Sequence, residues 1–191
     1  METFVREYPK QISDSVCDDL IDFFHEKKQM QDPTGESFVQ HINEDYRKDY
    51  ALNCQLFGTF KRKFQRYLDS EIHDAFQDYR SEMGRCWPKV YDNVHYKLQY
   101  ASPGGGFLSW HSDGGVEDLD RFLTWIIYLN DVDKGGRTEF RYQGEELKKG
   151  IVPEKGKLVL FPAARTHIHR AAPDLEQDKY ILTGWFTWRK P

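Results

Sequence analysis

The second half of the chain consists of short strand-like segments, and this pattern limits the folds open to it. Turn sequences such as "SPGGG", "DVDKGG" and "APDLEQD" separate runs rich in β-branched and aromatic residues. The runs are VHYKLQY, RFLTWIIYLN, GRTEFRY, GKLVLF and KYILTGWFTW. Because no helical pattern of about 10–15 residues lies between them, a parallel sheet with crossover helices is disfavoured. The pattern predicts an antiparallel sandwich or barrel.

The first half of the chain shows helical periodicity instead. In "SDSVCDDLIDFFHEKKQ", Ser13 can cap a helix with one apolar face, and a second helical pattern runs from about Ala51 to Met83. A chain of 191 residues is long enough for one domain with a real core. We therefore expect a single α+β domain over 1–191, with helical support in 1–88 and a β-rich core in 89–191.

Composition narrows the partners and the compartment. The net charge is −4, from 27 basic and 31 acidic residues, with no basic block, so neither a nucleic acid nor a membrane partner is expected. Cys17, Cys54 and Cys86 lack disulfide or zinc-site spacing and are predicted to be reduced. No signal peptide or apolar run of about 18 residues is visible, which predicts a cytoplasmic protein.

A histidine and an aspartate two residues apart stand in "GFLSWHSDGG". On an extended segment, residues i and i+2 point the same way, so the side chains of His111 and Asp113 converge. Such a pair is weak evidence alone. Further on, His167 and His169 follow a buried-looking strand, and two histidines with one carboxylate form the ligand set of non-haem Fe(II) oxygenases. Zinc is the rival metal, but its usual helical His-Glu-x-x-His signal is absent.

Four motifs in this order resemble the Fe(II)- and 2-oxoglutarate-dependent dioxygenases, and within them the prolyl 4-hydroxylase branch. They are YASPGGGFLSWHSD, RFLTWIIYLNDVDKGGRTEF, GKLVLFP and HRAAPDLEQDKYILTGW, and they cover about residues 90–190. The resemblance implies a double-stranded β-helix, a jelly-roll and cupin-like core supported by the N-terminal helices. It implies that His111, Asp113 and His169 hold the metal, because His169 stands ten residues before a basic residue as in the family.

That basic residue is Lys179, which opens the last predicted strand. Alternation places Lys179, Ile181, Thr183 and Trp185 on one face of it. A lysine pointing into a barrel needs an anion, since an unpaired buried charge is costly. The resemblance implies that this anion is the distal carboxylate of 2-oxoglutarate.

Further residues take roles from the same resemblance. Tyr100, Tyr128 and Thr138 match co-substrate contacts of the family, although the spacing from Tyr100 to His111 is extended and Tyr96 is an alternative. Arg121 and Trp185 match positions that face the substrate. Arg121 lies seven residues before Tyr128, so strict alternation would put the two on opposite faces. Either a bulge intervenes, or Arg121 lies just before the strand and reaches over the mouth of the barrel.

The function implied is hydroxylation of prolyl residues in a peptide or protein, with Fe(II), 2-oxoglutarate and O2, and with ascorbate as a reductant. Succinate and CO2 would be released. Two alternatives stay open: hydroxylation of a free amino acid or other small molecule, and a non-catalytic binding module of the same fold.

Overall fold

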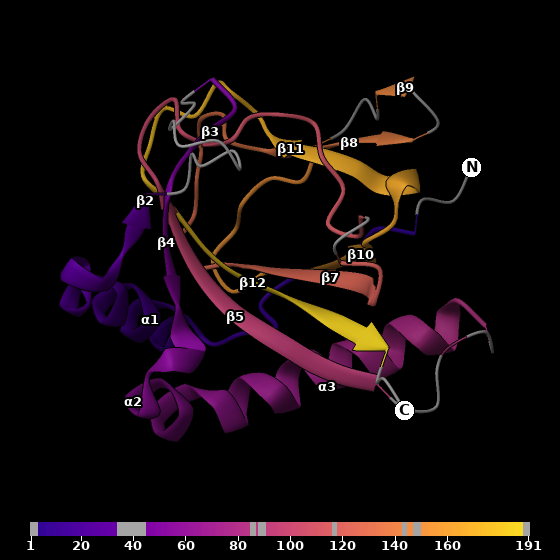
Figure 1. Ribbon diagram of the computed structural model, residues 1–191, viewed down its shortest axis with the longest axis horizontal. Helices are drawn as coiled ribbons and strands as arrows, with labels where there is room; N and C mark the ends of the chain where they lie inside the picture. Colours follow the sequence, from indigo (N-terminus) through magenta and orange to yellow (C-terminus); the bar gives the residue numbers. More distant parts are fainter. Residues whose placement is uncertain are drawn as a thin grey trace.

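Two antiparallel sheets face each other, and helices cover the outer side of the larger one (Figure 1). The computed structural model describes residues 4–33, 45–84, 87, 91–115, 118–142, 145–146 and 150–188. The helices are α1 (Asp14–Glu26), α2 (Gly58–Phe60) and α3 (Arg66–Glu82), with a π-helical turn η3 (Lys61–Gln65) and short 3₁₀ turns η1 (Lys28–Met30), η2 (Cys54–Leu56) and η4 (Arg165–His167).

The larger sheet has the strand order β1-β10-β7-β12-β5-β4-β2, and the smaller has the order β11-β8-β9. The larger comprises β1 (Arg6–Tyr8), β2 (Asp32–Pro33), β4 (Tyr50–Asn53), β5 (Tyr91–Ala101), β7 (Arg121–Tyr128), β10 (Leu158–Pro162) and β12 (Lys179–Trp188). The smaller comprises β8 (Thr138–Tyr142), β9 (Glu145–Glu146) and β11 (Ile168–Ala171), and β3 (Arg47–Lys48) pairs with β6 (Gly106–Phe107). This is the predicted jelly-roll fold.

Alternation along the strands of the larger sheet creates two apolar cores. In β7, Trp125 and Ile127 belong to the core shared with α1 and α3, whereas Ile126 and Tyr128 belong to the core between the sheets. The inner core also contains Phe140 of β8. The helices therefore support the sheet from behind and leave its inner face free to line a cavity.

The first half of the chain contributes more strand than its periodicity predicts. Helix α1 lies where expected, although the Ser13 side chain makes no capping hydrogen bond. The prediction of a helix from about Ala51 was wrong at its N-terminal end, because Ala51 and Leu52 lie in β4 and pair with Gln99 and Leu98 of β5. Strand pairing with β5 buries both apolar side chains, and this tertiary contact outweighs the local helical preference.

Two of the three cysteines lie in the described part of the chain, and both are buried free thiols. Burial raises the pKa of Cys17 to about 11 and that of Cys54 to about 12, so neither is a reactive thiolate at neutral pH. Cys86 lies outside the described residues. Among the described helices, none combines the length and apolar character needed to cross a bilayer.

A bulge where β12 meets β5 depends on a glycine. The register shifts between Thr183 and Trp185, and a Cβ at Gly184 would lie 2.0 Å from the His95 carbonyl oxygen and 2.3 Å from the Trp125 ring. We expect Gly184→Ala to lower the free energy of unfolding by about 1–3 kcal/mol, because backbone and indole must both move. Urea denaturation measures this, with Gly115→Ala as the control, since no atom lies within 4 Å of its Cβ position. Equal stability of the two variants would contradict the clash.

Candidate active site

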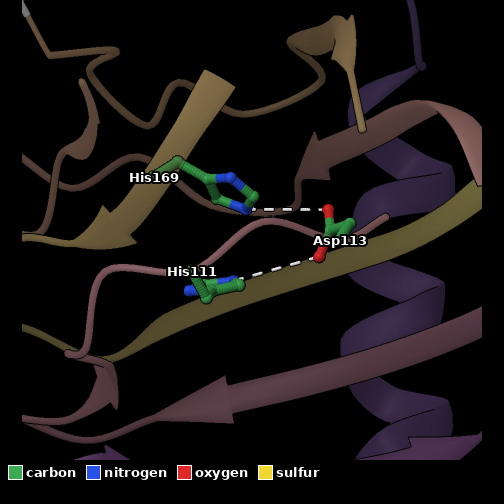
Figure 2. Close-up of side chains that lie close together, drawn as sticks. All are labelled: His111, Asp113 and His169. Atoms are coloured by element: carbon green, nitrogen blue, oxygen red, sulfur yellow. Dashed lines mark ion pairs between the residues drawn. The ribbon is translucent and has the colours of Figure 1, made fainter. Parts of the chain in front are cut away.

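Three side chains that can bind a metal converge between the sheets (Figure 2). His111 and Asp113 lie on the segment that follows β6, and His169 lies on β11. Their ligand atoms all lie within 4.8 Å of one another. The Nε2 atom of His169 is 3.6 Å from Asp113 Oδ2, and the Nε2 atom of His111 is 3.9 Å from Asp113 Oδ1. One ion can therefore be reached by all three groups.

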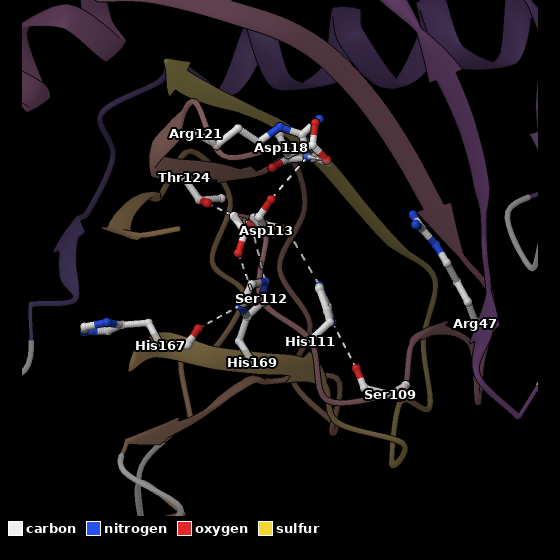
Figure 3. Close-up of polar contacts among 12 residues, drawn as sticks. Arg47, Ser109, His111, Ser112, Asp113, Asp118, Arg121, Thr124, His167 and His169 are labelled. Carbon is white, nitrogen blue, oxygen red and sulfur yellow. Dashed lines mark hydrogen bonds and ion pairs between the residues drawn. The ribbon is translucent and has the colours of Figure 1, made fainter. Parts of the chain in front are cut away.

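Backbone hydrogen bonds hold the two histidines beside each other. The His111 amide donates to the His169 carbonyl over 3.0 Å, and the His169 amide donates back over 2.8 Å. Each imidazole also donates from Nδ1 to a main-chain carbonyl, at Ser109 (2.9 Å) and at His167 (3.2 Å) (Figure 3). Because Nδ1 carries the proton, the Nε2 lone pair of each ring is available for a metal.

The electrostatics keep His111 and Asp113 in the protonation states that a metal requires. Burial, together with the charge of His169, lowers the pKa of His111 to about 3. Burial alone would raise the pKa of Asp113, but His169, His111 and a hydrogen bond from Thr124 Oγ1 (2.7 Å) hold it below its ordinary value. Neutral imidazole and ionised carboxylate are the ligand forms. Two histidines and a carboxylate on one side of a cavity fit Fe(II) with open positions.

His167 does not join this cluster. It lies in η4, where its Nδ1 shares a hydrogen bond with Thr166, and it lines a different hollow with Phe4 and Tyr79. Burial and the charge of His169 lower its pKa to about 4. The structure thus brings together the three residues that the resemblance assigns to the metal and leaves the alternative histidine outside.

Lys179 lines the same cavity, which measures about 120 Å³ and has room for a small co-substrate. The side chain is buried, donates to the Gly136 carbonyl and lies 5.5 Å above the Tyr128 ring. Burial lowers its pKa to about 8, with a small opposing effect of Asp174. Among the described residues it forms no ion pair, so its charge is available to a ligand carboxylate.

Two of the three expected hydroxyl contacts lie near Lys179. The Tyr128 hydroxyl and Thr138 Oγ1 share a buried hydrogen bond of 2.6 Å, and Thr138 lines the cavity. The pair links β7 of the larger sheet to β8 of the smaller one, and the Tyr128 ring lies beside the lysine.

Tyr100 is in the wrong place for the role expected of it. Its hydroxyl donates to Asp178 over 3.0 Å, and its ring packs on Tyr180 on the helix side of the sheet. Tyr96 lies on the same side. Alternation puts Lys97, Gln99 and Ala101 into the cavity instead. The spacing between Tyr100 and His111 did not indicate that Tyr100 faces the helices. The alternation of side chains along β5 would have indicated it.

A series of hydrogen-bonded polar side chains from outside the recognised motifs lines the cavity wall. Arg47 donates to both oxygens of Asp49, at 2.7 and 3.0 Å, and Gln99 donates to Asp49 over 2.7 Å. Arg47 also covers one side of Phe107, whose ring stacks on His111 at 3.5 Å between centroids. The first half of the chain therefore shapes the site, which no sequence motif indicated.

Arg121 and Trp185 lie together at the edge of the cavity. The Arg121 guanidinium is 3.9 Å above the Trp185 ring, forms an ion pair with Asp118 at 3.0 Å and donates to the Asp113 carbonyl over 3.4 Å. The β12–β7 register shifts between Phe186 and Thr187, directly beside Arg121. This irregularity brings Arg121 to the cavity side despite its odd spacing from Tyr128.

The chain was compared with known families and curated proteins. Residues 96–187 match the model of the 2OG-Fe(II) oxygenase superfamily. Prolyl 4-hydroxylase subunit alpha-1 of Gallus gallus is 32% identical over 107 residues, which are 47% of this chain and 20% of that protein. Prolyl 4-hydroxylase 13 of Arabidopsis thaliana is 22% identical over 167 residues, which are 78% of this chain and 54% of that protein. The chain thus matches between a fifth and about half of the length of these relatives.

Solved structures share the fold. A Pseudomonas putida prolyl-4-hydroxylase superposes with a TM-score of 0.69 at 17% identity, covering 98% of this chain and 94% of that one. A prolyl hydroxylase from Trichoplax adhaerens, solved with a hypoxia inducible factor peptide fragment, gives 0.72 at 18% identity, covering 97% and 84%. The segment 96–187, which carries all three ligand residues and Lys179, thus matches the 2OG-Fe(II) oxygenase superfamily model, and the chain is similar to prolyl 4-hydroxylases.

Proposed function

We propose that this chain hydroxylates prolyl residues of a peptide or protein in a reaction that depends on Fe(II) and 2-oxoglutarate. The observation that carries the proposal is the joint placement of the His111, Asp113 and His169 ligand atoms and of a buried lysine around one cavity. The similarity to prolyl 4-hydroxylases supports the choice of a prolyl substrate.

Each residue has a separate task in this proposal. His111, Asp113 and His169 would hold the metal on one side and leave its other positions free for reactants. Lys179 would bind the distal carboxylate of 2-oxoglutarate, with Thr138 beside it. Bound Fe(II) and 2-oxoglutarate supply the oxidising chemistry that places one oxygen atom of O2 on a C–H bond, with release of succinate and CO2. The protein supplies binding, orientation and exclusion of water.

Mass spectrometry of proline-containing peptides tests the proposal. Peptides are incubated with Fe(II), 2-oxoglutarate and ascorbate as reductant, and a gain of one oxygen atom at proline is expected only when 2-oxoglutarate is present. Free L-proline is the parallel substrate. Hydroxylation of free proline but of no peptide would mean that the substrate is a small molecule. The absence of succinate release under all conditions would refute the proposal that the chain is an oxygenase.

Arg121 is predicted to couple co-substrate consumption to product formation. It bridges Trp185 and the main chain of the ligand Asp113, so its loss leaves the three ligand side chains in place but loosens the wall against which substrate would lie. A misplacement of about an ångström costs on the order of 100-fold in transfer. For Arg121→Ala we expect slow succinate release to persist while hydroxylated product falls much further.

The ratio of hydroxyproline to succinate is the quantity to measure. Arg62→Ala, on the exposed side of η3, is the matched control and should keep the wild-type ratio. An unchanged ratio in the Arg121 variant would restrict this arginine to its structural contacts with Asp118 and Trp185.

A further inference from the structure

A second hollow continues from the metal cavity across the inner face of the larger sheet. Its lining residues are Asp32, Ala51, Asn53, His95, Lys97, Arg121 and Trp185. Lys97 and Trp185 also line the metal cavity, so the two spaces share a wall. A substrate that reaches the metal can extend into this hollow.

Some of the cationic side chains that line the metal cavity and the second hollow already form an ion pair with a carboxylate, and others do not. Arg47 pairs with Asp49 at 2.7 Å, Arg121 with Asp118 at 3.0 Å and Arg170 with Glu139 at 2.8 Å. Two lysines remain, and each has no ion pair within the described ranges. The Lys179 ammonium donates to the Gly136 carbonyl, whereas the Lys97 ammonium forms no hydrogen bond with any part of the chain that the structure describes.

The surroundings of Lys97 do not compensate its charge. Burial lowers its pKa to about 8, and the neighbouring cations Arg47 and Arg121 lower it further than Asp49 and Asp32 raise it. Lys97 is partly buried, and an ammonium that is partly withdrawn from water without a partner is favoured where a ligand supplies the counter-charge. The geometry of the hollow leaves its ammonium open to such a ligand.

Lys97 and Lys179 stand at opposite ends of the cavity. In the β12–β5 pairing, Lys179 faces Ala101 and Thr183 faces Lys97, so four residues separate the lysines along the strands. This separation is about 13 Å. A 2-oxoglutarate molecule anchored at Lys179 has its other end at the metal, so Lys97 is left for the second reactant.

The backbone beside Lys97 is held in an unusual conformation. His95 has a φ of 62°, in the left-handed region that few non-glycine residues adopt, and its ring meets the edge of Trp185 at 5.6 Å between centroids. Such strain persists only where the surrounding structure enforces it, and it is frequent at binding sites. Here it brings His95 to the rim of the hollow that Lys97 lines.

We propose that the hollow around Lys97 is a substrate subsite that binds a carboxylate, the side chain of an acidic residue near the hydroxylated proline, and that Lys97 determines this preference. The inference rests on the proposed function and adds the substrate class. Arg121 and Trp185 form the wall against which this part of the peptide packs.

A glutamate scan of a peptide substrate tests the subsite. A single glutamate or glutamine is placed at each position flanking the proline, and kcat/KM for hydroxyproline formation is measured. Binding of the same fluorescein-labelled peptides to enzyme loaded with Zn(II) and 2-oxoglutarate gives a second readout by anisotropy. At one position we expect glutamate to exceed glutamine by about tenfold, the usual effect of a charge-assisted contact.

Variants assign the preference to Lys97. Lys97→Met should reduce the glutamate-to-glutamine ratio to about one, and Lys97→Glu should favour a lysine at the same position. Lys63→Met, an exposed lysine on η3, is the matched control and should keep the wild-type ratio. Circular dichroism checks that all variants are folded.

The possible failures are distinguishable. Equal hydroxylation and binding of glutamate and glutamine peptides, or an unchanged ratio in Lys97→Met, would overturn the subsite and leave the proposed function standing. Binding that favours glutamate through Lys97, without hydroxylation of any peptide, would support the subsite and refute the proposed reaction. Lys97-dependent turnover of free L-proline, with no peptide bound, would overturn the assignment to an acidic peptide residue.

Discussion

Replacing any one of His111, Asp113 and His169 by alanine is expected to abolish 2-oxoglutarate turnover. Metal binding should weaken by more than about 100-fold, because even residues that only hydrogen-bond to metal ligands contribute about 10–100-fold to metal affinity. The three ligand atoms lie within 4.8 Å of one another, and the described residues place no other carboxylate or imidazole in the cluster. A site with two remaining ligands holds the ion at too few points to orient reactants.

Metal affinity is measured separately from turnover, by titrating Co(II) and following its absorption. His167→Ala is the control, because this histidine lines a different hollow and should leave metal affinity within about twofold of wild type, a change below 0.5 kcal/mol. Loss of binding in the His167 variant with retention in His169→Ala would reverse the assignment of the third ligand.

Lys179→Met is expected to weaken 2-oxoglutarate binding by about 2–3 kcal/mol and, at the same time, to stabilise the fold. The ammonium is buried without an ion pair in the described chain, and burial lowers its pKa from 10.5 to about 8. That difference is a cost to folding of about 3 kcal/mol at neutral pH, partly offset by its hydrogen bond to Gly136. We expect the free energy of unfolding to rise by about 1–3 kcal/mol in the variant.

Lys157→Met is the matched control with the opposite sign. Lys157 is also buried, but it donates to Glu7 at 2.9 Å and to Glu154 at 2.7 Å, and these contacts outweigh burial and raise its pKa. Its loss leaves both carboxylates without their partner and should destabilise the fold by about 2 kcal/mol, with unchanged 2-oxoglutarate affinity. Urea denaturation and calorimetric titration with a Zn(II)-loaded enzyme measure the two quantities. Destabilisation by both substitutions would mean that Lys179 serves packing alone.

The pH dependence of 2-oxoglutarate binding follows from the same lysine. Its pKa in the free protein is depressed to about 8, and a carboxylate binds the charged form. Affinity should therefore be constant below pH 8 and fall by about tenfold per pH unit above it, until the pKa of the complex is reached. Affinity that stays constant to pH 10 would place the binding charge on an arginine.

The amino-acid sequence by itself determined the residues whose roles depend on local spacing. Alternation in "HSD" made His111 and Asp113 converge, and alternation from Lys179 to Trp185 predicted the face that lines the cavity. Both inferences need only an extended backbone, which the flanking β-branched and aromatic residues favour. An antiparallel sandwich or barrel was predictable because short strands without intervening helices leave few alternatives, and the resemblance of the motifs narrowed this to a jelly roll.

Only the tertiary structure decided which residues from distant segments meet in the site. β4 pairs with β5 although its local pattern is helical, and this pairing brings Asp49 to Gln99 while Tyr100 turns to the helix side. The bulges in β12 set the positions of His95 and Arg121, and strict alternation could not predict them. The open ammonium of Lys97 was also invisible in the sequence, because a missing partner is a property of the packed neighbours and not of the residue itself.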